Sequence, residues 1–379
     1  MRRRYLAYLI LAVLPSLAAV VAGGMAAQHA WGALRSASWN WVGTVALRAL
    51  QEDLVIMVDS LAAAAQPTRV DARDPAWNRV DRGETVSAMR LRDPGAEVMV
   101  LTAPAPGDPA GTLRFAAAPL PEAPLVVARA AGSRLSLYLN GRRVLTTRDT
   151  LGPDALPRET LVALSAAPQG LALSDMEGAL VALDRPVGLP PSVAVMAAPL
   201  SPPAPTLPLS LLLVTGLLFL FAAVAGWIQL GAAQSVEGAG RRRSIVLVAL
   251  VPVLTAVGFL VQADRHFGDA ARSTAARNLT RALAVSSARG VVGSPEQVHE
   301  LTGFQATRVR DGRVEETTLS EPVAALAALP APPPSFTSAG TLATSDGPSL
   351  YVALRLSGGG FVVASTRRPD GRIAALRST

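Results

Sequence analysis

LPLSLLLVTGLLFLFAAVAGWIQL, residues 207–230, is a stretch without a single charged side chain. It is long enough to cross the roughly 30 Å hydrocarbon core of a bilayer as one helix, which takes about 20 residues. Two more uncharged apolar stretches lie at Tyr5–Ala27 and Ser244–Gln262, so the sequence predicts three transmembrane helices. A cleaved signal peptide is the alternative for the first stretch, which has a basic start and small residues near Gly24–Ala27.

The segments between and after these stretches are polar, strand-like and punctuated by Pro and Gly, so we expect two water-facing domains. The predicted division of the chain is a transmembrane helix at 1–27, a domain at 28–205, a transmembrane helix at 206–230, a loop at 231–243, a transmembrane helix at 244–262 and a domain at 263–379. The first domain carries an extra stretch, at about 70–130, which either extends its sheet or forms a lid.

Two clusters of three arginines determine the predicted orientation. Arg2–Arg4 precede the first apolar stretch, and Arg241–Arg243 lie between the second and the third. The positive-inside rule keeps both clusters in the cytoplasm. Other arginines, from Arg265 to Arg281, follow the third stretch on the other side and run against the rule, but the two compact clusters agree with each other. We therefore expect a multi-pass protein of the inner (cytoplasmic) membrane, with the loop inside and both domains extracytoplasmic.

Composition narrows the classes of partner and of chemistry. The chain of 379 residues has a net charge of +7, and because it contains no Lys, all 35 basic residues are Arg. These residues alternate with Asp and Glu and form no basic stripe beside stacking aromatic rings, so we expect no nucleic-acid partner. The absence of Cys excludes a disulfide framework, a thiolate metal site and a Cys nucleophile.

The two predicted domains share an internal similarity. Asn140–Thr147 and Asp311–Thr318 both begin with an N/D-G-R turn and end in Thr-Thr, at an offset of 171 residues from position 140 to position 311. Val181–Leu183 and Val352–Leu354 are identical at the same offset. Duplication explains two matches in one register. In a chain this rich in Ala, Leu and Val, chance is the alternative.

The shared segments predict an α+β fold with antiparallel sheets. Asn-Gly and Asp-Gly are typical of tight hairpin turns, which need positive φ. In each domain a hairpin, a short Ala/Leu helix and two closing strands follow one another. The predicted strands are Leu135–Leu139, Ala179–Leu183, Ser192–Ala197, Ala306–Arg310, Ser349–Leu356 and Phe361–Ser365, and the predicted short helices are Pro157–Ala167 and Pro322–Leu329.

A long helix is expected to continue from a membrane span into each domain, because apolar residues recur there at helical spacing. The apolar seams consist of Leu47, Leu50, Leu54, Met57 and Leu61 in the first domain and of Ala276, Leu279 and Leu283 in the second. A seam of this kind packs on its own sheet or pairs two copies of the chain, and both can hold at once. We expect a homodimer through these membrane-proximal helices.

The order of a span, a long helix, a hairpin, a short helix, two closing strands and a further span resembles the extracytoplasmic Cache (PAS-like) sensor domains of bacterial receptors and sensor histidine kinases. The residues that carry the resemblance are Leu135–Thr147 with Leu180–Leu183, and Ala306–Thr318 with Tyr351–Leu354, about a third of the chain. The resemblance implies PAS-like sheets that bind a small ligand. No transmitter motif is present, so a kinase or cyclase is expected beyond residue 379 or in a partner.

No catalytic set can be assembled from recognised motifs, so we expect no enzymatic activity, no metal and no cofactor. His29, His266 and His299 are isolated, and no second ligand has metal-site spacing to any of them. The function expected is that of a sensor. A non-signalling protein of cell-envelope assembly, scaffolding or transport is the alternative, and a membrane-anchored hydrolase is a third.

Three residues of the second domain are candidates for ligand binding. Tyr351 and Arg355 point to one face of their strand, because side chains alternate along a strand. Arg308 lies in the adjoining hairpin. One Tyr and two Arg together can bind a carboxylate. The alternative is that both Arg side chains lie on the solvent face.

Overall fold

The computed structural model describes residues 6, 8–63, 86–90, 97–104, 113–119, 123–139, 141–148, 150–166, 172–174, 178–182, 193–200, 209–232, 239–319, 324–333, 337–344, 347–367 and 369. The chain divides into two compact units. The helical unit consists of Met1–Arg35, Pro203–Ala275 and Arg368–Thr379, and the sheet unit consists of Ser36–Pro202 and Ala276–Arg367.

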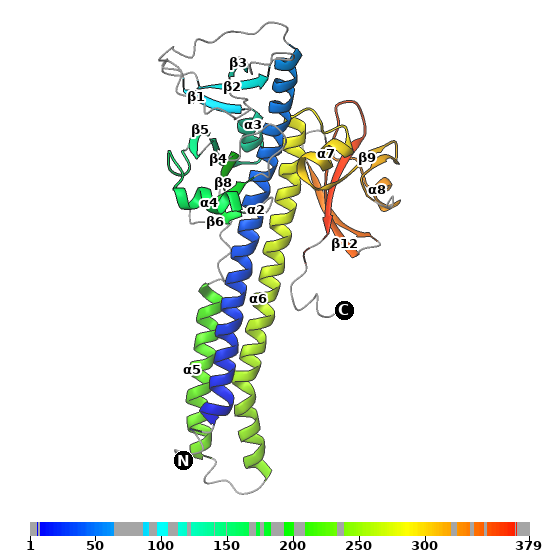
Figure 1. Ribbon diagram of the computed structural model, residues 1–379. Coiled ribbons are helices and arrows are strands. Elements are labelled where there is room, and N and C mark those ends of the chain that lie inside the picture. The colour runs from blue at the N-terminus through cyan, green and yellow to red at the C-terminus, as the bar shows by residue number, and fades with distance from the viewer. Residues whose placement is uncertain are drawn as a thin grey trace. The chain divides into compact units, whose positions relative to one another are not determined.

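The fold is α+β, with long helices and antiparallel sheets (Figure 1). The helical segments are η1 (Leu9–Val13), α2 (Leu14–Ala63), α3 (Ala123–Ala130), α4 (Arg158–Ala166), α5 (Leu209–Ala232), α6 (Ala239–Ala288), α7 (Pro295–Thr302) and α8 (Ala324–Ala327). The strands are β1 (Val86–Arg90), β2 (Glu97–Pro104), β3 (Leu113–Pro119), β4 (Ser133–Leu139), β5 (Arg142–Thr146), β6 (Ala172–Ser174), β7 (Ala179–Ala182), β8 (Val193–Pro199), β9 (Gln305–Arg310), β10 (Arg313–Thr317), β11 (Ser338–Thr344), β12 (Gly347–Arg355) and β13 (Phe361–Arg367).

The helical unit is apolar on its outside as well as at its centre. Its central cluster brings together residues of α2, α5 and α6, among them Val20, Phe219 and Phe259. Large apolar side chains also cover the outward faces of the same helices, for example Leu217 and Leu254. A bundle that faced water would bury such residues and expose polar ones. The outward apolar faces therefore match a hydrocarbon environment.

Two helices among the described residues are long and apolar enough to cross a membrane, Leu9–Leu50 and Ser210–Ile228. They overlap the first two predicted spans, 1–27 and 206–230. The third predicted span, 244–262, lies inside α6 and is not confirmed. The predicted loop at 231–243 is shorter in the structure, because α6 already begins at Ala239 and includes the three arginines that follow.

The two five-stranded sheets of the sheet unit have the same strand order. The first is ordered β5-β4-β8-β7-β6 and the second β10-β9-β13-β12-β11, all antiparallel. Numbered within its own sheet, each therefore runs 2-1-5-4-3. A short helix, α3 or α7, precedes each sheet. We call Ala123–Pro199 the first repeat and Pro295–Arg367 the second repeat.

The extra stretch of the first domain forms a sheet of its own. β1, β2 and β3 pair in chain order as a three-stranded antiparallel sheet. It therefore does not extend the five-stranded sheet. The extra stretch also ends earlier than predicted, because Ala123–Ala130 is helix α3, whose place before the first sheet is that of α7 before the second.

Each five-stranded sheet is covered on two faces. The inner face of the first sheet, with Leu135, Leu137 and Val195, shares a core with Leu47 and Leu50 of α2. The opposite face, which we call the outer face, forms a second core that includes Leu164 of α4 in the first repeat. In the second repeat the outer face packs around Leu326 of α8.

This packing supports the intramolecular interpretation of the apolar seams at four positions, and the expected homodimer stays a prediction. Leu47, Leu50, Leu279 and Leu283 are all fully buried within the chain itself. Burial inside one chain leaves these four positions no surface to offer to a second copy. The seams therefore pack intramolecularly there, whereas the side chains of Leu54, Met57 and Leu61 lie outside the described residues.

Candidate functional site

The hairpins that the two repeats share have the same backbone geometry. Gly141 and Gly312 adopt φ of 73° and 70°, and Asp311 adopts φ of 50°. Positive φ is accessible to Gly at little cost, which explains the Gly in each turn. The register of each hairpin then skips one residue, Val144 in the first repeat and Glu315 in the second. A β-bulge thus stands at the same place in both.

The Thr-Thr ends of the two hairpins form matching hydrogen bonds. The hydroxyl pairs Ser136–Thr146 and Thr307–Thr317 are 2.9 and 2.7 Å apart. The next threonine of each repeat accepts a backbone N–H: from Leu135 to Thr147 at 3.1 Å, and from Ala306 to Thr318 at 2.8 Å. Every one of these positions keeps the 171-residue offset, so the hairpin match is structural.

The second matched segment is not in structural register. In the first sheet Ser136 pairs with Met196, which pairs with Leu180. In the second sheet Thr307, the counterpart of Ser136, pairs with Val363, which pairs with Ala353. The counterpart of Leu180 is therefore Ala353, two residues beyond the position that the constant offset predicts. The shift is even, so the same side chains still face outward.

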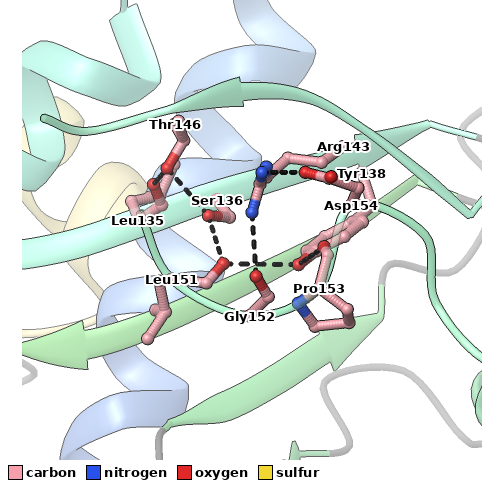
Figure 2. Close-up of polar contacts among 9 residues, drawn as sticks. All are labelled: Leu135, Ser136, Tyr138, Arg143, Thr146, Leu151, Gly152, Pro153 and Asp154. Atoms are coloured by element: carbon pink, nitrogen blue, oxygen red, sulfur yellow. Dashed lines mark hydrogen bonds and ion pairs between the residues drawn. The ribbon is translucent and has the colours of Figure 1, made fainter. Parts of the chain in front are cut away.

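Polar side chains on the first sheet hold a chain segment across its outer face (Figure 2). We call this segment, residues 151–154, the strap. The Ser136 hydroxyl donates to the Leu151 carbonyl at 2.7 Å, and the Tyr138 hydroxyl donates to the Pro153 carbonyl at 2.9 Å. Tyr138 is completely buried, so its ring fills the layer beneath the strap.

Arg143 holds the strap from its other edge. Its guanidinium donates to the Gly152 carbonyl at 2.8 Å and forms an ion pair with Asp154. The backbone adds two hydrogen bonds, from Arg143 N–H to the Asp154 carbonyl at 2.9 Å and from Leu156 N–H to the Gly141 carbonyl at 2.7 Å. The donors of Ser136, Tyr138 and Arg143 are thus engaged by the chain itself. This arrangement is a clamp for the strap rather than an open polar site.

The outer face of the second sheet is filled differently at its centre. Tyr138, Met196 and Leu180 of the first repeat correspond by strand pairing to Val309, Val363 and Ala353. All three side chains of the second repeat are smaller. The larger side chains there lie toward the edges, namely Phe361, which replaces Ala194, and Tyr351, which packs against Gly340 and the apolar cluster of this face.

The three predicted ligand residues do not lie on one face of the second sheet. Arg308 pairs with Val362, which pairs with Leu354, so Arg308 shares the inner face with Leu354. Tyr351 and Arg355 are odd numbers of residues from Leu354 and lie on the outer face. Strand pairing thus separates Arg308 from Tyr351 and Arg355, and the sequence could not show this because it depends on the register of β9, β13 and β12. Carboxylate binding by Tyr351 and Arg355 stays a prediction.

Arg308 has partners on the inner side of the sheet. Its Nε lies 3.0 Å from Glu315 Oε2, and its Nη1 donates to the Gly293 carbonyl at 3.3 Å. Glu315, the bulge residue of the second repeat, also lies within 3.8 Å of Arg310. Arg355 is exposed, which agrees for this residue with the alternative that the Arg side chains lie on the solvent face.

Two of the three histidines take part in packing and helix termination, whereas His29 is exposed. His299 Nδ1 lies 3.0 Å from the Phe304 carbonyl at the end of α7. The His266 ring lies near Trp31, with a centroid distance of 6.3 Å. Within the described part of the chain, no three His, Asp or Glu residues come close enough to hold a metal ion.

An ion-pair cluster that sequence reasoning missed joins the long helices inside the sheet unit. Arg289, directly after α6, binds Glu52 at 2.7 Å and Asp53 at 3.1 Å, both on α2. Burial by itself lowers the pKa of Arg289, but hydrogen bonds and attraction from the two carboxylates outweigh it, so that the pKa is raised. The sequence signal was the adjacent acidic pair in a long helix that has few other charged residues.

No family model, no curated protein and no solved structure matches this chain.

Proposed function

We propose that the chain is the membrane-anchored, extracytoplasmic sensor region of a bacterial signal-transduction receptor, and that it binds a small ligand. The observation that carries the proposal is the pair of sheets with one strand order. α2 contains a candidate membrane span, and its residues from Val42 to Leu50 pack on the first of these sheets. An antiparallel sheet that follows a long membrane-proximal helix is what the Cache resemblance implies.

The proposed topology has three spans, with both repeats outside and 231–243 inside. The exposed apolar residues of α6, among them Val253, Leu254 and Val257, support the third span. Pro252 lies inside the same helix, and such residues are tolerated in transmembrane helices. Because the chain is free of Cys, single cysteines test the topology cleanly. A Cys at Ser235 should be inaccessible to an impermeant maleimide added to intact cells, and one at exposed Thr280 should be labelled.

The second repeat is the better candidate for ligand binding. In the first repeat the polar donors of the outer layer are engaged by the strap, and Tyr138 fills the space beneath it. The second repeat has smaller side chains at the centre of the corresponding face, with Tyr351 and Phe361 toward its edges. A ligand that binds one arrangement of this layer more tightly than another shifts the population of arrangements, which is the elementary act of a sensor.

The test is hydrogen-exchange mass spectrometry of the full chain in nanodiscs, with a panel of amino acids and of di- and tricarboxylates. At least one compound should slow exchange in peptides from 305–319 and 347–367, and it should be recovered chemically unchanged. Tyr351→Phe should weaken that protection, and Val162→Ala, on exposed α4 of the first repeat, should leave it intact. Catalytic conversion of a compound, or no protection at saturation across the panel, would count against the sensor proposal.

A further inference from the structure

α2 and α6 run parallel to each other within the sheet unit. The Ser38 hydroxyl donates to Asn278 Oδ1 at 3.1 Å, and further along both helices Arg289 reaches Glu52 and Asp53. The sequence numbers of the contacting residues rise together on the two helices, which defines the parallel direction. Residues far apart in the chain thus meet along one helical seam.

α2 also contacts the second repeat beyond α6. Trp41 Nε1 donates to the Thr302 carbonyl at the end of α7 at 2.7 Å, and the Trp41 ring lies 5.4 Å from that of Phe304. Arg48 donates to the Glu300 carbonyl at 2.8 Å. The hydrophobic core of the first sheet itself includes Leu301 of α7 and Val285 of α6. The two repeats therefore share a core.

The charges along this seam favour pairing of α2 with α6 over pairing of either helix with its own copy in a second chain. In a parallel two-fold pair, residues near the axis face their own copies. Two copies of α2 would place Glu52 and Asp53 against Glu52 and Asp53, and two copies of α6 would oppose Arg289 to Arg289. Like charges in contact disfavour such pairing. The observed pair of α2 with α6 places the two carboxylates against one guanidinium instead.

We propose that the two repeats form an internal dimer. In this dimer α2, which packs on the first repeat, pairs with α6 of the same chain, which leads to the second repeat. The pairing uses helix faces that would otherwise be available to a second copy of the chain. The partner of each helix is the other repeat of the same chain. A covalent link keeps the effective concentration of that partner high without any second molecule. The inference rests on the packing of the sheet unit and stands apart from ligand binding or signalling.

Disulfide cross-linking of the full chain tests the internal dimer, because the chain has no Cys of its own and only the introduced thiols can react. Ser38→Cys with Asn278→Cys should form an intrachain disulfide on mild oxidation in membranes. The product should run at monomer mass with a mobility that reductant reverses. A matched pair, Ser38→Cys with Thr280→Cys, moves the second thiol to an exposed position two residues on and should cross-link several-fold less.

The single variants decide between pairing within a chain and pairing between chains. Ser38→Cys alone and Asn278→Cys alone should yield no disulfide-linked dimer. Dimers from either single variant, or from the double variant in place of the closed monomer, would overturn the proposal. Failure of the double variant to cross-link more than its Thr280 control would do the same.

A second measurement does not depend on introduced thiols. Arg289→Ala should raise hydrogen exchange several-fold both in α2 peptides around 42–53 and in peptides around 279–302, because one side chain holds both segments. Arg272→Ala is the control, since Arg272 lies within α6 and pairs with Asp269 of the same helix. It should change exchange only locally. Loss of protection on one side alone in Arg289→Ala would contradict a shared interface.

Discussion

The first and second repeats have the same framework but differ in what lies on its outer face. Both sheets have the 2-1-5-4-3 order, a bulge at the same place and the same Thr-centred hydrogen bonds in the hairpin. The first repeat covers its outer face with Tyr138 and the strap, whereas Val309 stands at the position of Tyr138 in the second. The framework is thus independent of how the outer layer is filled.

The physical reason is that the hairpin is determined by residues close together in the sequence, whereas the outer layer is determined by residues from several distant elements. The hairpin depends on positive φ at one Gly and on hydroxyls that bond to neighbouring backbone, all within about a dozen residues of chain. The outer layer depends on side-chain volumes supplied by several strands and a helix. Volumes can change together while the backbone pairing stays, as long as the layer remains filled.

The largest expected difference between the repeats is at Tyr138 and Val309. Tyr138→Ala removes a fully buried aromatic ring and should lower the local stability of the first repeat by about 3–5 kcal/mol. Val309→Ala removes two buried methyl groups and should cost the second repeat about 2 kcal/mol. Hydrogen exchange of peptides from 133–147 and 305–318, in the full chain in detergent, reports each repeat separately.

Tyr138→Phe separates the ring from the hydroxyl. It keeps the ring and leaves the Pro153 carbonyl without this donor, so the loss should be about 1 kcal/mol. An equal loss for Tyr138→Phe and Tyr138→Ala would mean that the hydrogen bond, and not the volume, distinguishes the first repeat.

The turn glycines should differ less between the repeats. Gly141→Val and Gly312→Val each force a β-branched residue to positive φ, at a cost of about 1–3 kcal/mol. Gly141 should be the more sensitive, because a Cβ there would lie 2.7 Å from Leu161 Cδ1, whereas the nearest atom at Gly312 is 3.9 Å away. The midpoint of local opening by urea, followed by hydrogen exchange, measures both. A tolerated Val at either position would remove the turn as the origin of the shared framework.

A smaller contrast is expected at the two hydroxyl pairs. Ser136→Ala removes the donor to the Leu151 carbonyl and the contact with Thr146, so it should cost about 1–2 kcal/mol. Thr307→Val keeps the side-chain shape and loses the pairing with Thr317, and about 0.5–1.5 kcal/mol is expected. The exchange of peptides covering 150–157 should rise only for Ser136→Ala. A rise there for Thr307→Val would link the two outer layers.

The sequence predicted local structure well and long-range register poorly. The hairpin turns, six strands and both short helices lie within a few residues of their predicted places. Three strands, β1, β6 and β11, and two helices, α3 and α7, were not predicted. In β6 and β11 the small residues give weak periodicity. The placement of Arg308 and Tyr351 on opposite faces could not be predicted for another reason. Alternation fixes the relative faces of residues on one strand, but only strand pairing relates one strand to the next.

The smallest expected effect is at the charge that holds the strap. The Asp154 side chain is 90% exposed, and an exposed ion pair contributes little because water and salt screen it. Asp154→Asn also keeps the backbone hydrogen bond from Arg143 N–H and the bond from the Arg143 guanidinium to the Gly152 carbonyl. The loss should therefore be under about 1 kcal/mol, and it should vanish near 1 M salt, where the Debye length is about 3 Å. Exchange of peptides covering 141–156, measured with and without salt, gives the answer. If Asp154→Asn opened the strap as far as Ser136→Ala does, charge rather than buried hydroxyls would hold it, and the first repeat would differ from the second in electrostatics instead of packing.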